Sequence, residues 1–377
     1  MTEAKKRGRL IRGQPSTSDR STTEHLAAVG TTVAVKNFNA VDVARFVLAI
    51  FIVTIHTEPF SQLNETANFI CTQILARVAV PFFFIAASYF FFRKIDIRQL
   101  HQHRSDADGR HLKKYIVRVV KLYGIWSALY LILFFYDWSQ KGESLATNLF
   151  YLFRGPFVGI YYHLWFLSAL ILVILAVYAA LRYVNPKLLW TSGLILCGLA
   201  LLFALYSTFV HGGAWDVLTD LDNRYLENMA GHLAFGLLFV ILGAILSQHR
   251  IVPRNKTILS LLFAAAMAAM FLGAFWLRKD GLNRGVDLTM APAAVLLFLL
   301  LANIHLKDSA FIPYFRNTSL LIYLIHPLFI VLIATLTGWK DNLKAFLIVT
   351  ACSILFSAIL VLLSRKHRRF HFLTHLY

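Results

Sequence analysis

The first long apolar segment carries an arginine and a histidine whose spacing places them on one face of a helix. Arg45 precedes His56 by eleven residues, and at about 100° per residue these steps return to within about 20° of the same direction. Asp42 lies about 40° from His56 on the other side and is close enough along the helix to pair with Arg45. Because imidazole titrates near physiological pH, His56 could serve as the general base for acyl transfer to a hydroxyl.

Arg45 and His56 are nevertheless separated by about 16 Å along the helix axis. We therefore interpret them as the two ends of one elongated site, with Arg45 near the cytoplasmic side and His56 toward the outer half. The alternative is a structural histidine that bonds a backbone carbonyl or lies at the interface. Since polar groups inside an apolar span are costly, the aligned Asp42 and Arg45 favour the site.

Three further segments place polar side chains in apolar surroundings. Arg77 needs a partner or water near the outer boundary, although it could equally be an anchor that snorkels to the interface. His326 follows Tyr323 near the middle of an apolar segment and is interpreted as a partner or a lining group of the site. His163 and Trp165 stand at an outer helix end, where aromatic residues are also favoured without any catalytic role.

Charged residues at both ends of the predicted site suggest further roles. Arg118 and Lys121 lie one helical turn apart and could bind the phosphates of a soluble donor at the cytoplasmic mouth. The simpler interpretation is a topological anchor on anionic lipid. Glu58 follows His56 by two residues and could orient its imidazole if the chain turns back there.

The elements that must position these residues are membrane-spanning helices. The 377 residues are 58% hydrophobic and 15% charged, which is unusual for a water-soluble domain of this length. Apolar runs of roughly 20 residues can cross the bilayer as helices. We predict an all-α, polytopic helical bundle with about ten spans: 41–57, 73–92, 115–136, 164–184, 188–206, 229–247, 258–277, 288–304, 319–337 and 343–363.

The formal net charge of +18 is explained by topology rather than by nucleic-acid binding. Most Lys and Arg fall in alternate connecting segments, so the positive-inside rule places both termini in the cytoplasm. We predict three parts: a disordered basic tail over residues 1–39, a membrane domain over 40–364 and a basic cytoplasmic tail over 365–377. The cysteines show no metal-binding spacing, and we expect no bound metal or permanent cofactor.

Taken together, these motifs resemble the acyltransferase 3 family of membrane O-acyltransferases, from Asp42 to about Leu363. The chain reproduces the family's pattern of an arginine, ten residues and a histidine in the first span, and its Pro-Phe-Phe-Phe segment in the second. Two further signatures follow in the expected order. The matching residues are Arg45, His56, Arg77 through Tyr89, His163-Leu-Trp165-Phe-Leu167 and Tyr323-Leu-Ile-His326-Pro327.

The resemblance implies a multi-pass protein of the cell membrane that moves an acyl group, often acetyl, from acyl-coenzyme A to a hydroxyl. The acceptor would be a cell-surface glycan or a lipid-linked envelope molecule, and a separate extracytoplasmic transferase could complete the transfer. In that picture His56 is the base and Arg45 supports the site. Lys121 replaces the second arginine of a family pair, and Ala87 with Ser88 replaces its Ser-Gly.

The chain is also similar to the membrane portion of vancomycin-resistance serine racemases, especially over 77–84 and 162–165. That portion is associated with serine supply. The alternative function is therefore the transport of a small molecule, such as an amino acid, across the envelope.

Overall fold

All regular structure in the described part of the chain is helical. A computed structural model describes residues 37–97, 100, 106–209, 217, 220–221, 228–248, 255–279 and 287–377. These residues contain no strand, which confirms the predicted all-α membrane bundle. Residues 38–377 form one compact unit. The predicted basic tail over 1–39 lies outside the described residues, except for its last three positions.

The helices follow the predicted spans closely. Their bounds are α2 Asn39–Thr57, α3 Glu65–Phe69, α4 Ala79–Phe92, α6 Asp106–Lys141, α7 Leu145–Val158, α8 Trp165–Tyr183, α9 Pro186–Phe209, α11 Met229–Gln248, α12 Lys256–Lys279, α13 Asp287–Ala302, α14 Ile312–Thr337 and α15 Leu343–Lys366. Eight helices of the described part are long and apolar enough to cross a membrane. The two predicted spans outside these eight fall on α9 and on the shorter apolar α13.

The second span is continuous but irregular. Between α3 and α4 the chain forms a π-helix over Ile70–Leu75 and a 3-10 helix over Ala76–Val78. Pro81 follows directly in the first turn of α4, and its missing N–H removes one hydrogen bond of the preceding turn. Such π segments inside helices often mark functional sites, and Arg77 lies in the 3-10 helix that follows this one.

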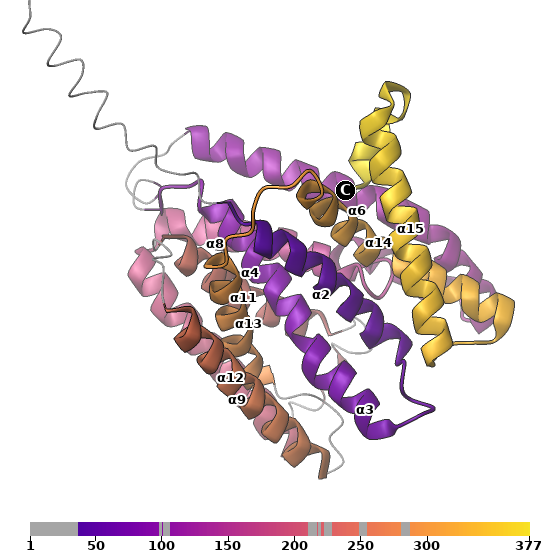
Figure 1. Ribbon diagram of the computed structural model, residues 1–377, viewed down its shortest axis with the longest axis horizontal. Coiled ribbons are helices and arrows are strands. Elements are labelled where there is room, and N and C mark those ends of the chain that lie inside the picture. The colour runs from indigo at the N-terminus through magenta and orange to yellow at the C-terminus, as the bar shows by residue number, and fades with distance from the viewer. Residues whose placement is uncertain are drawn as a thin grey trace, which may run out of the picture. The chain divides into compact units, whose positions relative to one another are not determined.

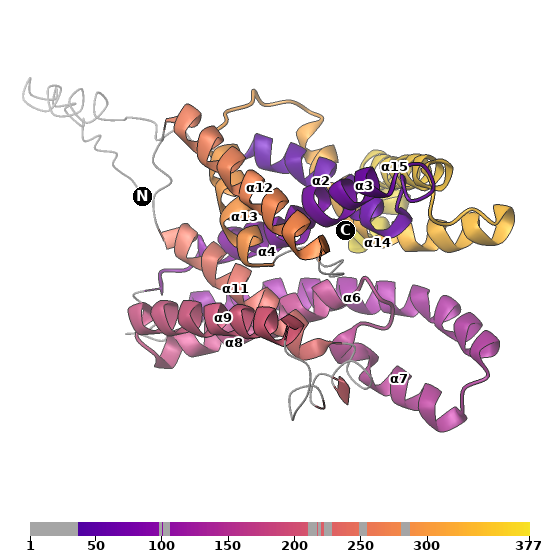
Figure 2. The same ribbon diagram turned by 90° about the horizontal axis from the view of Figure 1, so that it is seen from below.

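The helices of this unit are arranged in two layers (Figure 2). The first layer contains α6, α7, α8 and α9, and the second contains α2, α4, α12, α13, α14 and α15. Helix α11 lies between them and contacts α4, α8 and α9. In the second layer α2 packs against α14 and α4 (Figure 1), so the polar face of α2 meets residues from α14.

Gly243 allows α11 to approach α4 closely. A Cβ atom at Gly243 would lie 2.6 Å from the carbonyl oxygen of Ile85 and 2.7 Å from Cβ of Ser88. One turn earlier, the Ser88 hydroxyl donates a hydrogen bond of 2.6 Å to the carbonyl oxygen of Val240. Small residues at such crossings are typical of helix packing in membranes.

Gly243→Ala is therefore expected to destabilise the protein by about 2 kcal/mol, as overpacking of a close contact does. The added methyl group meets backbone, which cannot rotate away as a side chain can. Thermal unfolding of the purified protein in detergent would measure the change. Gly198→Ala on α9 is the matched control, because a Cβ there has nothing within 4 Å. Equal melting temperatures for the two variants would contradict the packing described.

The segment predicted as a C-terminal tail folds back onto the bundle. It forms a 3-10 helix over Arg368–Leu376. The indole Nε1 of Trp126 in α6 donates to the carbonyl oxygen of Leu376 at 3.1 Å, and the Tyr377 hydroxyl lies 2.6 Å from the Ser364 hydroxyl. These contacts place the segment against α6 and α15.

Candidate active site

The N-terminal half of α2 contains the predicted ion pair. Arg45 Nη1 donates to Asp42 Oδ1 at 2.9 Å, so the expected pairing is confirmed. Their side chains are only 17% and 12% exposed, and the Arg45 guanidinium lies 5.0 Å from the ring centre of Phe90. A pair this deeply placed is screened little by solvent.

A second arginine, which the sequence analysis missed, reaches the same carboxylate. Arg316 of α14 places Nη1 3.9 Å from Asp42 Oδ2, and its side chain is 54% exposed. Two guanidinium groups on one carboxylate leave a surplus positive charge at this end of α2. We call Asp42, Arg45 and Arg316 the arginine cluster. Its charge and partial exposure suit an anionic group such as a phosphate.

The predicted phosphate-binding pair lies on the exposed face of α6. Both Arg118 and Lys121 are exposed. Tyr115, one turn before Arg118, lies within electrostatic reach of both Arg118 and Arg45, so this face of α6 adjoins the arginine cluster. Lys121 instead lines a groove with Gly124, Ile125 and His375.

The opposite end of α2 brings three histidines together. His56 occupies the last turn of α2, and its ring stacks on that of His326 with a centroid distance of 5.3 Å and an interplanar angle of 26°. The ring of His163 lies edge to face with that of His326 at 5.7 Å. We call these three residues the histidine cluster. All three residues are predicted from the sequence, which does not show that they meet.

A turn before α8 brings His163 into the cluster. Gly159 ends α7 with φ of 104°, and a Cβ there would lie 2.8 Å from the backbone nitrogen of Trp165, so only glycine suits this position. The turn is fixed on α14, because the Tyr323 hydroxyl donates to the carbonyl oxygen of His163. His163 is 2% exposed, so its ring is buried within the cluster.

Tyrosine rings surround the histidine cluster. The ring of Tyr162 lies 4.9 Å from that of His56 and is 43% exposed, so it covers His56 from the open side. Tyr161, which precedes it, stacks on Tyr130 at 4.9 Å. Burial, with a smaller contribution from Asp137, raises the pKa of Tyr161 to about 12, so its hydroxyl stays neutral at physiological pH.

Two predicted residues flank the cluster without joining its rings. Arg77 donates from Nε and Nη2 to Gln73 Oε1, at 3.0 and 2.5 Å, and it lies within electrostatic reach of His56. Trp165 instead stacks on His232 of α11, with a centroid distance of 4.0 Å and an interplanar angle of 12°. Trp165 therefore packs between α8 and α11, and His232 was not predicted.

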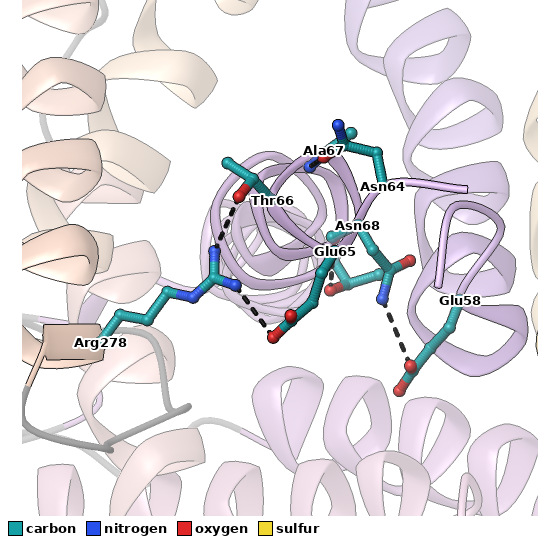
Figure 3. A network of polar contacts seen from close by, with 8 residues as sticks. Glu58, Asn64, Glu65, Thr66, Ala67, Asn68 and Arg278 are labelled. Atoms are coloured by element: carbon teal, nitrogen blue, oxygen red, sulfur yellow. Dashed lines mark hydrogen bonds and ion pairs between the residues drawn. The ribbon is translucent and has the colours of Figure 1, made fainter. Parts of the chain in front are cut away.

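Glu58 belongs to a polar network at the C-terminal end of α2 (Figure 3). It adopts the left-handed conformation with φ of 39° and accepts a hydrogen bond of 3.3 Å from Asn68 Nδ2. Nearby, Arg278 of α12 contacts Glu65 at 3.0 Å and the Thr66 hydroxyl at 3.5 Å. The chain does turn at Glu58, as the predicted role required, but the hydrogen bond goes to Asn68 rather than to His56.

The geometry of α2 thus connects two chemically different clusters. Asp42 and Arg45 belong to the arginine cluster and His56 to the histidine cluster, while α14 supplies Arg316 and His326 to the same two ends. Apolar side chains that include Ile52 and Val53 of α2 and Ile322 of α14 pack between these ends. Within the described residues no group of three or more His, Cys, Asp or Glu side chains could hold a metal ion. The site can bind an anion at one end and exchange protons at the other.

Comparisons with known proteins identify a family for this chain. A family model described as an acyltransferase domain matches residues 38–363. The chain is 28% identical over 353 residues to an amino-acid racemase of Enterococcus faecalis, covering 88% of this chain and 47% of that protein. It is 25% identical over 345 residues to a serine/alanine racemase of Enterococcus gallinarum, covering 88% and 46%. The chain therefore spans about half the length of these relatives. No solved structure gives a significant match.

Proposed function

This chain belongs to the acyltransferase domain family, and we propose that it transfers an acyl group, in particular acetyl, from acyl-coenzyme A to a hydroxyl of an envelope molecule. Membership of this family and the eight long apolar helices support the general function of a multi-pass membrane acyltransferase. The observation that carries the finer proposal is the pairing of α2 with α14. Each helix contributes an arginine to one end of the site and a histidine to the other.

The donor enters this scheme from the cytoplasmic end. The phosphates of coenzyme A are multiply charged, and the forked guanidinium groups of Arg45 and Arg316 match them. Arg118 lies one turn after Tyr115, which is within electrostatic reach of Arg45, and in this scheme Arg118 adds a third positive charge. The long, flexible arm of the donor would then carry the thioester about 16 Å along α2 toward His56.

The acceptor meets the acyl group at the histidine end. His56 is half-buried, and the ring that lies against it, that of Tyr162, is exposed, so a hydroxyl from the outer side would reach His56 once that ring moves. The proposed acceptor is a glycan or a lipid-linked molecule of the cell envelope, modified directly or through a separate extracytoplasmic transferase. The protein would lie in the cell membrane with both termini in the cytoplasm.

Arg316→Gln is expected to raise KM for acetyl-coenzyme A about tenfold with little change in kcat. Loss of one charge-assisted hydrogen bond to a phosphate costs about 1.4 kcal/mol of donor binding, at the low end of the usual range. Steady-state kinetics on the purified protein would measure both constants. Arg369→Gln, in the exposed C-terminal segment, removes the same charge and should leave KM unchanged. An equal shift in both variants would indicate only a general effect of net charge.

Amino-acid transport is the second candidate function, favoured by the likeness to proteins named racemases. The two functions differ in whether a thioester is consumed. Purified protein in sealed liposomes should release coenzyme A from acetyl-coenzyme A, at a rate that depends on His56, and should not accumulate labelled serine. Serine uptake without release of coenzyme A would show that the protein is a transporter rather than an acyltransferase.

A further inference from the structure

We propose that His326 is a second catalytic base, which acts on the acceptor hydroxyl while His56 carries the acyl group. This inference rests on the proposed function, because it divides the same transfer into two steps. It assigns different roles to two imidazoles that lie 5.3 Å apart.

The backbone of α14 fixes the proton of His326 on one ring nitrogen. Nδ1 lies 2.8 Å from the carbonyl oxygen of Tyr323 and 3.2 Å from that of Ile322. Carbonyl oxygens only accept hydrogen bonds, so Nδ1 must carry the hydrogen. In the neutral ring Nε2 then holds a lone pair and can only accept. His326 is therefore held in the tautomer that a base requires.

The lone pair of His326 is buried without a partner. The residue is 0% exposed, and its Nε2 has no hydrogen-bond partner among the described residues. Buried polar atoms are rarely left unsatisfied, and exceptions call for an explanation. A hydroxyl that donates to this nitrogen provides one. Because no described residue supplies such a hydroxyl, we assign it to substrate or water.

The positions of the rings suggest the order of events. His56 is accessible from the open side once the ring of Tyr162 moves, and that ring is already 43% exposed. The ring of His326 contacts those of His56 and His163, and His326 is fully buried whereas His56 is half-buried. A hydroxyl admitted past Tyr162 would therefore meet the acylated His56 first and could donate its proton to His326.

The two steps balance without any further reagent. In the first, a ring nitrogen of His56 attacks the thioester carbonyl, the C–S bond breaks and the acyl–N bond forms. The proton of the imidazole leaves with the sulfur, so coenzyme A is released as the thiol. In the second, His326 Nε2 takes the proton of the acceptor hydroxyl, the oxygen attacks the acyl group and the acyl–N bond breaks. The proton then returns to His56.

A second base is needed only for the second step. The acylated ring of His56 keeps a lone pair on its other nitrogen, but the electron-withdrawing acyl group makes that nitrogen too weak a base to activate an alcohol or water. A thiol ionises far more easily than an alcohol or water, so coenzyme A can take the acyl group back without His326. Exchange of label between coenzyme A and acetyl-coenzyme A therefore tests the first step, and release of acetate to water tests the second.

The experiment uses the full-length protein in detergent with acetyl-coenzyme A and tritiated coenzyme A. The native protein should catalyse both the exchange and the slow release of acetate. His326→Asn keeps an amide donor near the position of Nδ1 and removes the base. It should retain the exchange and lose at least about 10²-fold in acetate release. Hydroxylamine, a nucleophile that needs no base, should restore release of the acetyl group. Retained exchange also shows that the variant is folded.

Two results would overturn the inference while leaving acyl transfer intact. One is acetate release by native protein without any exchange, which would indicate direct transfer with a single base. The other is loss of exchange and release together in a folded His326→Asn. If that variant does not fold, native protein quenched with acid should still carry acetyl on the peptide that contains His56, and an unlabelled peptide would count against the inference. Absence of any coenzyme A release would instead overturn the proposed function itself.

Discussion

His56→Ala is expected to lower the release of coenzyme A from acetyl-coenzyme A by at least about 10²-fold and by as much as about 10⁴-fold. No other histidine of the cluster can replace it, because His163 and His326 are almost fully buried, whereas His56 is half-buried. KM for the donor should change little, since the arginine cluster lies at the far end of α2. Initial rates over a range of donor concentrations would measure kcat and KM separately.

The control for this variant is another histidine that lies outside the site. His371 is exposed in the C-terminal 3-10 helix, and His371→Ala should retain the native rate. Both variants must elute as single species and melt within a few degrees of the native protein. Retained activity in His56→Ala would contradict the proposed mechanism, because His56 is its central residue.

Asp42→Ala is expected to destabilise the protein by about 3 kcal/mol, because removal of one partner leaves a buried charge uncompensated. Here two guanidinium groups lose the same carboxylate. Arg45 is most affected, since its side chain is only 17% exposed. Thermal unfolding in detergent would measure the loss. Donor binding should weaken as well, because Asp42 holds both arginines at the mouth of the site.

A double variant separates charge from packing in this prediction. In Asp42→Ala with Arg45→Met the unpaired charge is absent, so part of the lost stability should return. Asp106→Ala serves as the control for loss of a carboxylate, since Asp106 is exposed at the start of α6 and should change stability by less than about 0.5 kcal/mol. If the double variant were as unstable as Asp42→Ala, the ion pair would not be the cause.

The helices could be predicted largely from the sequence, because membrane spans need long apolar runs. Shorter elements of local structure were harder to predict from the sequence. The helix Leu145–Val158 was missed, since 14 residues with Pro156 inside are too short for a span and lie in a segment interpreted as a loop. Ser144 caps it by accepting a hydrogen bond from the backbone nitrogen of Thr147, and this capping pattern was the available signal.

The site could be predicted along one helix but not between helices. Helical periodicity was sufficient to align Asp42, Arg45 and His56. It could not show that α14 packs on α2, and so Arg316 was missed although it precedes His326 by ten residues, much as Arg45 precedes His56 by eleven. That repeated order of arginine and histidine in two spans was a usable signal. The stacking of Trp165 on His232 likewise depends on tertiary packing.

The most direct test of the account is the sidedness of acyl transfer in sealed membrane vesicles from cells that contain the protein. Labelled acetyl-coenzyme A cannot cross a bilayer, so it reaches the arginine cluster only from the cytoplasmic face. Inside-out vesicles should incorporate label into envelope material enclosed in the lumen, whereas right-side-out vesicles should do so only after permeabilisation. Vesicles with His56→Ala should incorporate none in either orientation. Incorporation confined to intact right-side-out vesicles, or label that stays on the donor's side, would contradict transfer along α2 from the arginine cluster to His56.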